Sequence, residues 1–294
     1  MKRPPATPQK HPPGLRPLPP VPRHGIHLLD HLADTLNLSR RAAKKLLDDR
    51  VVFVNGRRIW MARHKLQTRD EVAILPTAPT TPQKTNAPPP PIRILLDTPA
   101  FLVADKPPNL LTTGEKSLET RLRAQLNHPA LRAVHRLDKD TTGCVLFAKN
   151  EPTRQALIAQ FEAGHVHKLY HALIAGHLPQ PQMTITTPID HLPALTRLRQ
   201  VSTQNKPPRS AHVTITIETG RTHQIRIHLH QLGAPVLGDR QYFSARHPHF
   251  TAVPRQMLHA TQLRFTHPDT RQPVTATSPL PRDFRDWMRH LNLT

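Results

Sequence analysis

The sequence predicts an α+β protein built from two compact units. Its 294 residues favour about two domains, and many of its 34 prolines gather in two stretches that separate blocks with apolar periodicity. We interpret these stretches as a disordered or polyproline tail over residues 1–22 and a semi-rigid linker over residues 76–91. The predicted units are a small module over residues 23–75 and a larger domain over residues 92–294.

The chain is strongly basic, with 41 Lys and Arg against 20 Asp and Glu and a formal net charge of +21. Such an excess indicates a polyanionic partner, either nucleic acid or an acidic membrane surface. The sequence contains no run of about 18 apolar residues, so it predicts no membrane-spanning helix. Its first residues lack the apolar core of a secretory signal. The single cysteine, Cys144, excludes an intramolecular disulfide and a multi-cysteine zinc ribbon. We therefore expect a cytoplasmic protein.

Local patterns in the first block predict two helices. Apolar residues recur at helical spacing between Leu28 and Leu36. Ser39 then offers an N-cap for a second helix that extends to about Arg50. The apolar face of this second helix is expected to contain Ala42, Ala43, Leu46 and Leu47.

A hairpin is predicted after the second helix. Residues 51–54 and 57–59 have the composition of paired strands, and the Asn55-Gly56 pair between them is typical of a type I′ turn. Residues 71–75 add a short strand. The helix and hairpin share a basic face with few compensating acids, which is either a merely solvated surface or a platform that grips phosphates. We favour the platform, and its residues are Arg40, Arg41, Lys44, Lys45, Arg57 and Arg58.

Four segments of the larger domain place charged or hydroxyl-bearing side chains beside predicted elements. Residues 103–108 end a strand in a rigid turn, and residues 135–143 form a charged turn before an apolar run that suits a buried strand. Residues 168–174 alternate like a strand, after a helix that begins near Asn150. Taken alone, each of these segments is explained equally well or better by an ordinary charged turn or by a residue packed in the core.

The last segment, residues 218–229, alternates like a strand but is punctuated like a helix. Thr222 suits an N-cap, and Gly233 follows the end of the apolar face. We therefore predict a helix here, after a strand over residues 211–218. Arg226 then lies in the first helical turn, where it either faces solvent or reaches a neighbouring carboxylate.

Together the four segments resemble, in their order, the RluA-type family of RNA pseudouridine synthases over residues 92–285. The matching stretches are HRLDKDTTG, KLYHALIAG, TGRTHQIRIHLHQLGAPVLGD and LHATQLRFTHP. Residues 26–75 resemble the RNA-binding module named after the fourth protein of the small ribosomal subunit, which is common in this family. The resemblance implies a catalytic domain with a mixed, mainly antiparallel β-sheet flanked by helices.

The resemblance implies an isomerase that cleaves the glycosidic bond of a uridine in RNA, rotates the uracil and rejoins it through carbon 5 to give pseudouridine. No cofactor, metal or energy source is implied, because the reaction is an isomerisation. By resemblance Asp138 is the essential carboxylate, acting either as a nucleophile at the anomeric carbon or as a base on the 2′ position. Tyr170 is implied to stack beneath the uracil and to help remove the carbon-5 proton, and Arg226 to favour the ionised aspartate.

Further residues are expected to contact RNA. By resemblance Arg136 fills or holds the position that the flipped base vacates. His135 and Lys106 either support the loop around Asp138 or contact phosphates. We also expect Arg221 to bind RNA.

Three positions depart from the patterns of the two families. Leu28 stands where the RNA-binding module usually has a basic residue, which puts one RNA contact in doubt. Asn109 stands where glycine is expected, although asparagine tolerates the positive φ that such a turn needs. Thr142 replaces a serine and keeps the hydroxyl.

We expect RNA as the partner of a monomeric protein that does not bind membranes. Ribosomal RNA of the large subunit is favoured, because family members with this module commonly act there, and transfer RNA is second. A non-catalytic RNA-binding or ribosome-assembly protein is an alternative. A histidine-based metal hydrolase is a further rival, since His165 and His167, and His228 and His230, form close pairs, but nearby carboxylates are scarce.

Overall fold

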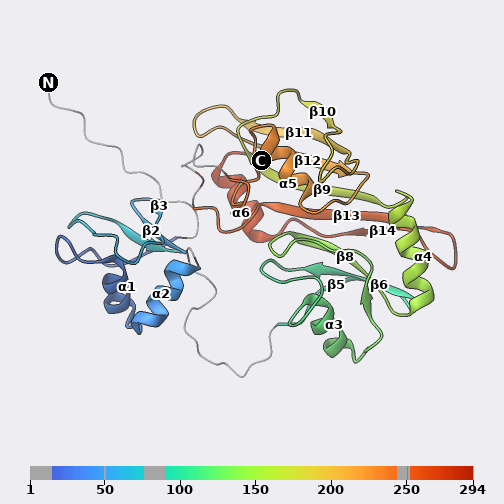
Figure 1. Cartoon of the computed structure of the whole chain (residues 1–294), viewed down its shortest axis with the longest axis horizontal. Helices are drawn as coiled ribbons and strands as arrows, with labels where there is room; N and C mark the ends of the chain where they lie inside the picture. Colours follow the sequence, from blue (N-terminus) through green and yellow to red (C-terminus); the bar gives the residue numbers. More distant parts are fainter. Residues whose placement is uncertain (1–14, 50, 76–89, 244–249, 251, 294) are drawn as a thin grey trace. The chain divides into compact units, whose positions relative to one another are not determined.

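The computed structural model describes residues 15–49, 51–75, 90–243, 250 and 252–293 (Figure 1). These residues fall into two units. One contains the described residues up to 75 together with 250 and 252–254, and the other contains residues 90–243 and 255–293. No helix within these ranges is long and apolar enough to cross a membrane.

The N-terminal unit contains the predicted helices and hairpin. Its elements are α1 (Leu28–Leu36), α2 (Arg40–Asp48), β1 (Arg16–Pro17), β2 (Val52–Val54), β3 (Arg57–Arg58) and β4 (Val72–Ile74). The Ser39 hydroxyl accepts a hydrogen bond from the Ala42 amide at 3.2 Å, as expected of an N-cap. Asn55 and Gly56 both have positive φ, which confirms the predicted turn type.

Strand β1 corrects part of the predicted tail. Arg16 and Pro17 pair with β4 at the edge of a four-stranded sheet whose order is β1-β4-β2-β3. An edge strand tolerates proline, because only one side of it must supply hydrogen bonds. Val21 is buried as well, so the packed unit begins before residue 23. Residues 1–14 of the predicted tail and residues 76–89 of the predicted linker lie outside the described residues.

The larger unit is built on a mixed, mainly antiparallel sheet whose main path runs β10-β11-β12-β9-β13-β8-β6-β5. Strands β8 and β13 run parallel, and the other described pairings of this sheet are antiparallel. The strands are β5 (Ile94–Asp97), β6 (Phe101–Lys106), β7 (Arg132–Ala133), β8 (Thr142–Ala148), β9 (His167–Ala175), β10 (Gln182–Ile185), β11 (Thr196–Gln204), β12 (Ser210–Ile217), β13 (Leu258–Thr266) and β14 (Pro273–Thr277). This architecture confirms the predicted fold class.

Helices cover both faces of this sheet. They are α3 (Leu118–Leu126), α4 (Glu151–Glu162), α5 (Gln224–Gln231) and α6 (Arg282–His290). Side chains of α3 and α5 share one hydrophobic core with β9 and β12, whereas α4 packs in a second core with alternate residues of β6, β8 and β13. Phe284 of α6 contacts His212, which points away from the first core. Figure 1 shows α3 beside β5 and β6, and α4 at the far end of β13 and β14.

The central strands align three residues that position the site. Gly143 of β8 and Tyr170 of β9 both pair with Ala260 of β13. A Cβ atom at Gly143 would lie 2.1 Å from the Ala260 carbonyl oxygen, so only glycine permits this approach. The loop that precedes β8 therefore enters the sheet one strand away from Tyr170.

Candidate active site

The loop between β7 and β8 carries Asp138 and is braced from below. Leu137 is buried in the first core, and its amide and carbonyl groups both bond the Thr112 hydroxyl at 3.1 Å. The Leu110 amide donates to the Lys139 carbonyl oxygen at 3.1 Å. The Asp138 carboxylate stays accessible, with 27% of its side chain exposed. The loop is thus fixed on both sides of an accessible acid.

Lys106 lies beneath this loop and not on the protein surface. It is fully buried, and its Nζ donates to the carbonyl oxygens of Pro107, Lys139 and Thr141 at 3.0, 2.8 and 2.9 Å. Burial lowers the pKa of Lys106 to about 7. Of the two roles expected for this residue, loop support has structural evidence and phosphate contact does not, because no ligand reaches a fully buried ammonium group.

His135 is also engaged inside the protein. Its Nε2 accepts a hydrogen bond from the Leu146 amide at 3.1 Å, and its ring stacks on Phe161 with centroids 4.8 Å apart. Burial and the nearby Lys168 charge lower the pKa of His135 to about 3, so the ring is neutral. Of the two roles expected for His135, these contacts support bracing of the loop around Asp138, and a phosphate contact stays a prediction.

Arg226 reaches Asp138 from the first turn of α5. The Arg226 Nη1 donates to Asp138 Oδ2 at 2.8 Å, so the arginine is bonded to a carboxylate and does not face solvent. The helix cap differs from the prediction: the N-cap is His223 in the left-handed region, with φ 55°, and not Thr222. The helix begins one residue later than predicted, because Gln224 accepts bonds from the Arg221 amide and the Thr219 hydroxyl and so closes the preceding turn.

Three residues around Arg226 were not identified as functional from the sequence. Asp239 accepts two bonds from the guanidinium, the Tyr242 ring lies 5.0 Å from its central carbon, and His223 Nδ1 lies 3.1 Å from the Tyr242 hydroxyl. The His223 Nε2 is 3.8 Å from Asp138 Oδ1. The only signal for Asp239 was its place at the end of the matching TGRTHQIR-to-GD stretch. Nothing in the local pattern singled out Tyr242.

Tyr170 lies in the first core, with 6% of its surface exposed. Burial raises the pKa of its phenol, and the negative charge of Asp138 raises it further. The phenol is therefore protonated at neutral pH. Both roles that the family resemblance implies for Tyr170, stacking on the uracil and help in removing the carbon-5 proton, stay predictions.

Two further arginines were expected to contact RNA. Arg136 lies in the loop between β7 and β8, and Arg221 lies shortly before α5. Arg136 is exposed immediately before the buried Leu137, and its contact with RNA stays a prediction. Arg221 is half-buried, and its Nε donates to the Pro193 carbonyl oxygen at 2.9 Å. Arg221 thus braces the loop before β11. One of its N–H groups is engaged within the protein, so fewer of its donors are accessible to RNA than we expected.

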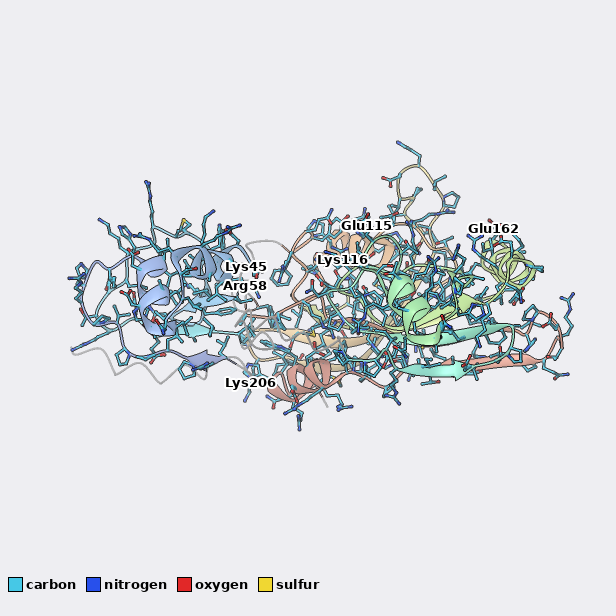
Figure 2. The ribbon with its side chains drawn as sticks, turned by 90° about the horizontal axis from the view of Figure 1, so that it is seen from below. Lys45, Arg58, Glu115, Lys116, Glu162 and Lys206 are labelled. Atoms are coloured by element: carbon cyan, nitrogen blue, oxygen red, sulfur yellow. The ribbon has the colours of Figure 1, made fainter. Side chains whose placement is uncertain are left out.

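The basic face of the N-terminal unit is more compensated than the sequence indicated. Three of its cations form ion pairs: Arg40 with Asp30, Lys44 with Asp48, and Lys45 with Asp49. These pairs are exposed, so they contribute little and are readily replaced by phosphate contacts. Arg58 is half-buried, with its guanidinium over the Phe53 ring. Figure 2 labels Lys45 on α2 and Arg58 on the hairpin.

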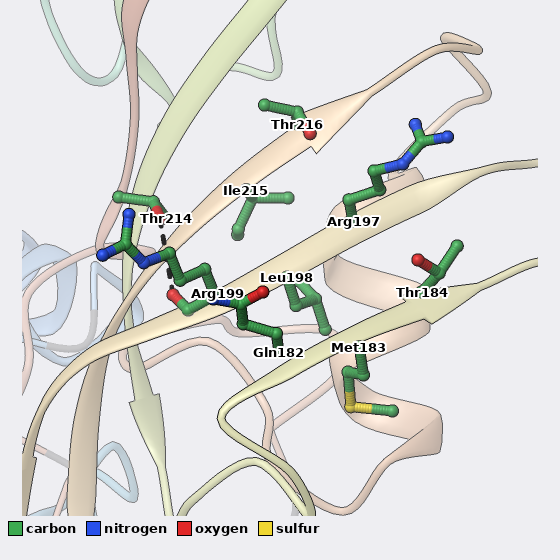
Figure 3. A pocket seen from close by; sticks show the side chains of 9 residues that line it. All are labelled: Gln182, Met183, Thr184, Arg197, Leu198, Arg199, Thr214, Ile215 and Thr216. Carbon is green, nitrogen blue, oxygen red and sulfur yellow. Dashed lines mark hydrogen bonds between the residues drawn. The ribbon is translucent and has the colours of Figure 1, made fainter.

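A hollow away from Asp138 lies over β10, β11 and β12 (Figure 3). Its lining includes Arg199 and Thr214, whose hydroxyl donates to the Arg199 carbonyl oxygen at 3.4 Å. Arg197, also in the lining, pairs with Glu218. Neither Asp138 nor Tyr170 lines this hollow, and it offers no carboxylate held by a buried arginine. We therefore place the candidate site at Asp138.

Among the described residues, the histidine pairs that suggested a metal site lack the further His, Cys, Asp or Glu ligands that a metal ion needs, and His228 has other hydrogen-bond partners. Within the ranges that the structure describes, no three His, Cys, Asp or Glu residues gather as metal ligands would. The ring nitrogens of His228 bond the Thr196 hydroxyl at 2.9 Å and the Thr187 carbonyl oxygen at 3.0 Å. His228 therefore anchors α5 to the loop before β11.

Comparison with known proteins adds a family to this geometry. The family described as RNA pseudouridylate synthase matches residues 100–231. Ribosomal large subunit pseudouridine synthase D of Nitrosomonas europaea is 36% identical over 219 residues, covering 66% of this chain and 63% of the relative. An uncharacterized RNA pseudouridine synthase of Mycoplasma pneumoniae is 30% identical over 287 residues, covering 89% of this chain and 91% of the relative.

The chain spans less than two thirds of the Nitrosomonas relative, and 52% of an uncharacterized RNA pseudouridine synthase of Chloroflexus aurantiacus that is 37% identical over 171 residues. Among solved structures, human RNA pseudouridylate synthase domain containing 4 has the same fold, with a TM-score of 0.58 and 23% identity over 68% of this chain and 93% of that one. The sequence, the fold and the relatives agree, and the chain belongs to the RluA-type family of RNA pseudouridine synthases.

Proposed function

We propose that this protein isomerises uridine to pseudouridine in RNA, with Asp138, Tyr170 and Arg226 as its catalytic residues. The observation that carries the proposal is the 2.8 Å ion pair between Asp138, on a braced and accessible loop, and Arg226, in the buried first turn of α5. The guanidinium offsets the charge of the acid and directs one of its oxygens. The other carboxylate oxygen is then available to act on the ribose, either at the anomeric carbon or at the 2′ position.

The surrounding residues supply the remaining steps of the reaction. Tyr170 offers a buried, neutral ring on which the detached uracil stacks while it rotates. Arg136, exposed beside the catalytic loop, occupies the place of the flipped base. Tyr170 also helps to remove the carbon-5 proton, because its phenol offers a proton-transfer oxygen beside the apolar ring.

We propose large-subunit ribosomal RNA as the substrate. The supporting evidence is that several relatives are named ribosomal large subunit pseudouridine synthase C or D. The basic face on α2 and the hairpin holds the RNA by its phosphates, while Arg41 and Arg57 remain exposed there. Transfer RNA is the second candidate substrate. We further propose that the protein acts as a monomer in the cytoplasm.

The first test compares two acids of one loop. We expect Asp138→Asn to abolish pseudouridine formation while RNA affinity changes by less than about threefold, because the substitution removes the reacting charge and keeps the shape. Asp140→Asn serves as the matched control and is expected to keep at least about half of the wild-type rate. The measurement is single-turnover conversion of uridine in transcribed RNA, together with an RNA binding curve.

Two outcomes would contradict the proposal. If Asp138→Asn converts uridine at a normal rate, the assigned carboxylate is wrong. If the wild-type protein binds RNA but forms no pseudouridine on any RNA, it is a binding or ribosome-assembly protein. Base-resolved pseudouridine mapping in cells that express wild-type protein or Asp138→Asn identifies the RNA, because only positions lost in the variant are its targets.

A further inference from the structure

Arg226 lies between two carboxylates that hold it unequally. Its Nε and Nη2 donate to the two oxygens of Asp239 at 2.5 and 3.0 Å, whereas only Nη1 donates to Asp138, at 2.8 Å. The Asp239 side chain is completely buried, and the Asp138 side chain is 27% exposed. The bidentate partner is therefore the inaccessible one, and the partner with a single bond faces the substrate.

Both acids contribute to the charge balance of this buried cluster. Burial alone would raise the pKa of Asp239, but the bonds and charge of Arg226 lower it below its ordinary value. Burial works against the charge of Arg226, yet the two aspartates together raise its pKa. If Asp138 were the sole partner, its engagement with the ribose would leave a buried guanidinium unpaired, which is strongly unfavourable. With Asp239 in place, Arg226 stays neutralised throughout.

Asp239 also organises the residues that cover Arg226. Its Oδ1 accepts hydrogen bonds from the backbone amides of Gln241 and Tyr242 at 2.9 and 3.0 Å. These bonds fix the turn that places the Tyr242 ring against the guanidinium, 5.0 Å from centroid to central carbon. The Asp239 side chain thus binds the edge of the Arg226 guanidinium directly, and it positions the Tyr242 ring against the face of the same group.

We propose that Asp239 is a positioning residue that holds Arg226 in place and balances its charge, so that Asp138 can leave the guanidinium and engage the ribose. This inference rests on the proposed function for the assignment of Asp138. It does not require Asp239 to touch the substrate.

The activity test uses Asp239→Asn, which keeps the shape and removes the charge. We expect the single-turnover rate at saturating RNA to fall about 100-fold, as for a displaced catalytic group, while the RNA dissociation constant changes by less than about threefold. Asp97→Asn is the matched control, because Asp97 forms an ion pair with Lys149 at the end of β8 that lies away from the catalytic loop. The control is expected to keep the wild-type rate.

Tyr242→Phe separates two routes by which Asp239 could act. Phenylalanine keeps a ring over Arg226 and removes only the hydrogen bond to His223. If Asp239 acts through Arg226, the rate of Tyr242→Phe stays within about threefold of wild type. A loss as large as that of Asp239→Asn would instead place the effect on the Tyr242–His223 bond and overturn the inference.

A readout independent of activity follows the Arg226 Nε–H proton by nitrogen-15 NMR, with the resonance assigned by its loss in Arg226→Lys. We expect this proton to exchange slowly with water in the wild-type protein and in Asp138→Asn. In Asp239→Asn we expect its exchange to accelerate at least about tenfold, because the charged acceptor at Nε is gone. Equal protection in Asp239→Asn and wild type would show that Asp239 does not hold Arg226.

The two readouts keep the inference and the proposed function distinguishable. If wild-type protein forms no pseudouridine but Arg226 protection depends on Asp239 as expected, the proposed function fails and the positioning contact stands. If wild-type protein is active and Asp239→Asn keeps its rate, or loses RNA binding in parallel with the rate, the positioning role is wrong.

Discussion

Lys106 places an ammonium group where water cannot reach it. Its three N–H bonds match three backbone carbonyl oxygens, two of which belong to the loop that carries Asp138. Burial lowers the pKa of this lysine to about 7, so the contact is costly to maintain unless all three acceptors are in place. The residue therefore ties the end of β6 to the loop between β7 and β8, which carries Asp138.

Replacing this lysine tests the brace. We expect Lys106→Met to lower the free energy of unfolding by about 1–3 kcal/mol, because it leaves buried carbonyl oxygens without donors. We also expect the catalytic rate to fall, since the loop that orients Asp138 is released. Chemical denaturation and single-turnover rates measure the two effects.

Lys139→Met is the matched control, because Lys139 belongs to the same loop and its side chain is exposed. A rate and stability equal to wild type are expected for this control. Lys106→Met with unchanged stability would mean that the carbonyl oxygens find other donors, and the brace would then be unimportant.

For individual residues, the sequence predicts functional side chains that lie in recognisable motifs. It misses those that only folding brings close to the site. Asp138 and Arg226 are far apart in the chain, yet both lie in patterned segments, and the structure joins them at 2.8 Å. Asp239 and Tyr242 follow α5 in a turn without periodicity. Asp239 ends a matching stretch, but only the three-dimensional contacts show what either residue binds. Lys106 looks like an RNA contact because burial of a lysine leaves no trace in a local pattern.

Among the secondary-structure elements, β8 and β13 approach more closely than side chains normally allow. The approach is confined to Gly143, whose φ of 110° is itself outside the range of most residues, and to the Ala260 backbone. Because β13 pairs with β9 at the same residue, the approach also sets the distance between Tyr170 and the loop that precedes β8.

We expect Gly143→Ala to be strongly destabilising, by several kcal/mol or enough to prevent folding, because its Cβ would lie 2.1 Å from a backbone oxygen that cannot move without breaking the sheet. Thermal unfolding and yield of soluble protein measure the effect.

Two control glycines separate space from backbone strain. Gly176→Ala tests positive φ alone, since a Cβ there meets nothing within 4 Å, and Gly220→Ala has neither problem. We expect a moderate loss for the first and almost none for the second. A Gly143→Ala protein as stable as Gly176→Ala would refute the close approach.

Element boundaries show which local signals suffice. The Ser39 and Asn55-Gly56 signals predict α2 and the hairpin because capping and turn chemistry are local. Strand β1 is missed because a proline-rich segment resembles a tail until β4 supplies a partner. The cap of α5 shifts to His223 because the Gln224 side chain, and not Thr222, satisfies the preceding turn.

The larger unit as a whole holds three uncharged histidines on neighbouring strands of its sheet; His212 and His259 are buried, and His212 contacts Phe284 of α6. His171 Nδ1 lies 2.7 Å from His212 Nε2, and both nitrogens of His259 are engaged, with the Thr142 hydroxyl at 2.8 Å and the Ser278 carbonyl oxygen at 3.1 Å. Burial lowers the pKa of His212 and of His259 to about 4 from an ordinary value of 6.5.

These shifts predict a loss of stability in mild acid. Below pH 6.5 these histidines become protonated in the unfolded chain but stay neutral in the folded protein. The stabilisation present above pH 6.5 is therefore lost as the pH falls toward about 4. The contribution is roughly 3 kcal/mol at most for each ring. Denaturant unfolding between about pH 7 and pH 4.5 measures it.

Substitutions connect the effect to these rings. His259→Gln should flatten the dependence on pH, while His165→Gln, at an exposed histidine after α4, should leave it unchanged. A free energy of unfolding that stays constant across this range would contradict the prediction.

The position of β13 between β8 and β9 has a consequence for the newly made chain. Ribosomes complete β8 and β9 well before β13 emerges, yet these two strands meet only through it. Until then each presents an unpaired edge, and Asp138 and Tyr170 have no common frame. The part of the sheet that joins Asp138 and Tyr170 is therefore completed only after β13 has been made, and the edges of β8 and β9 stay open to other strands until then.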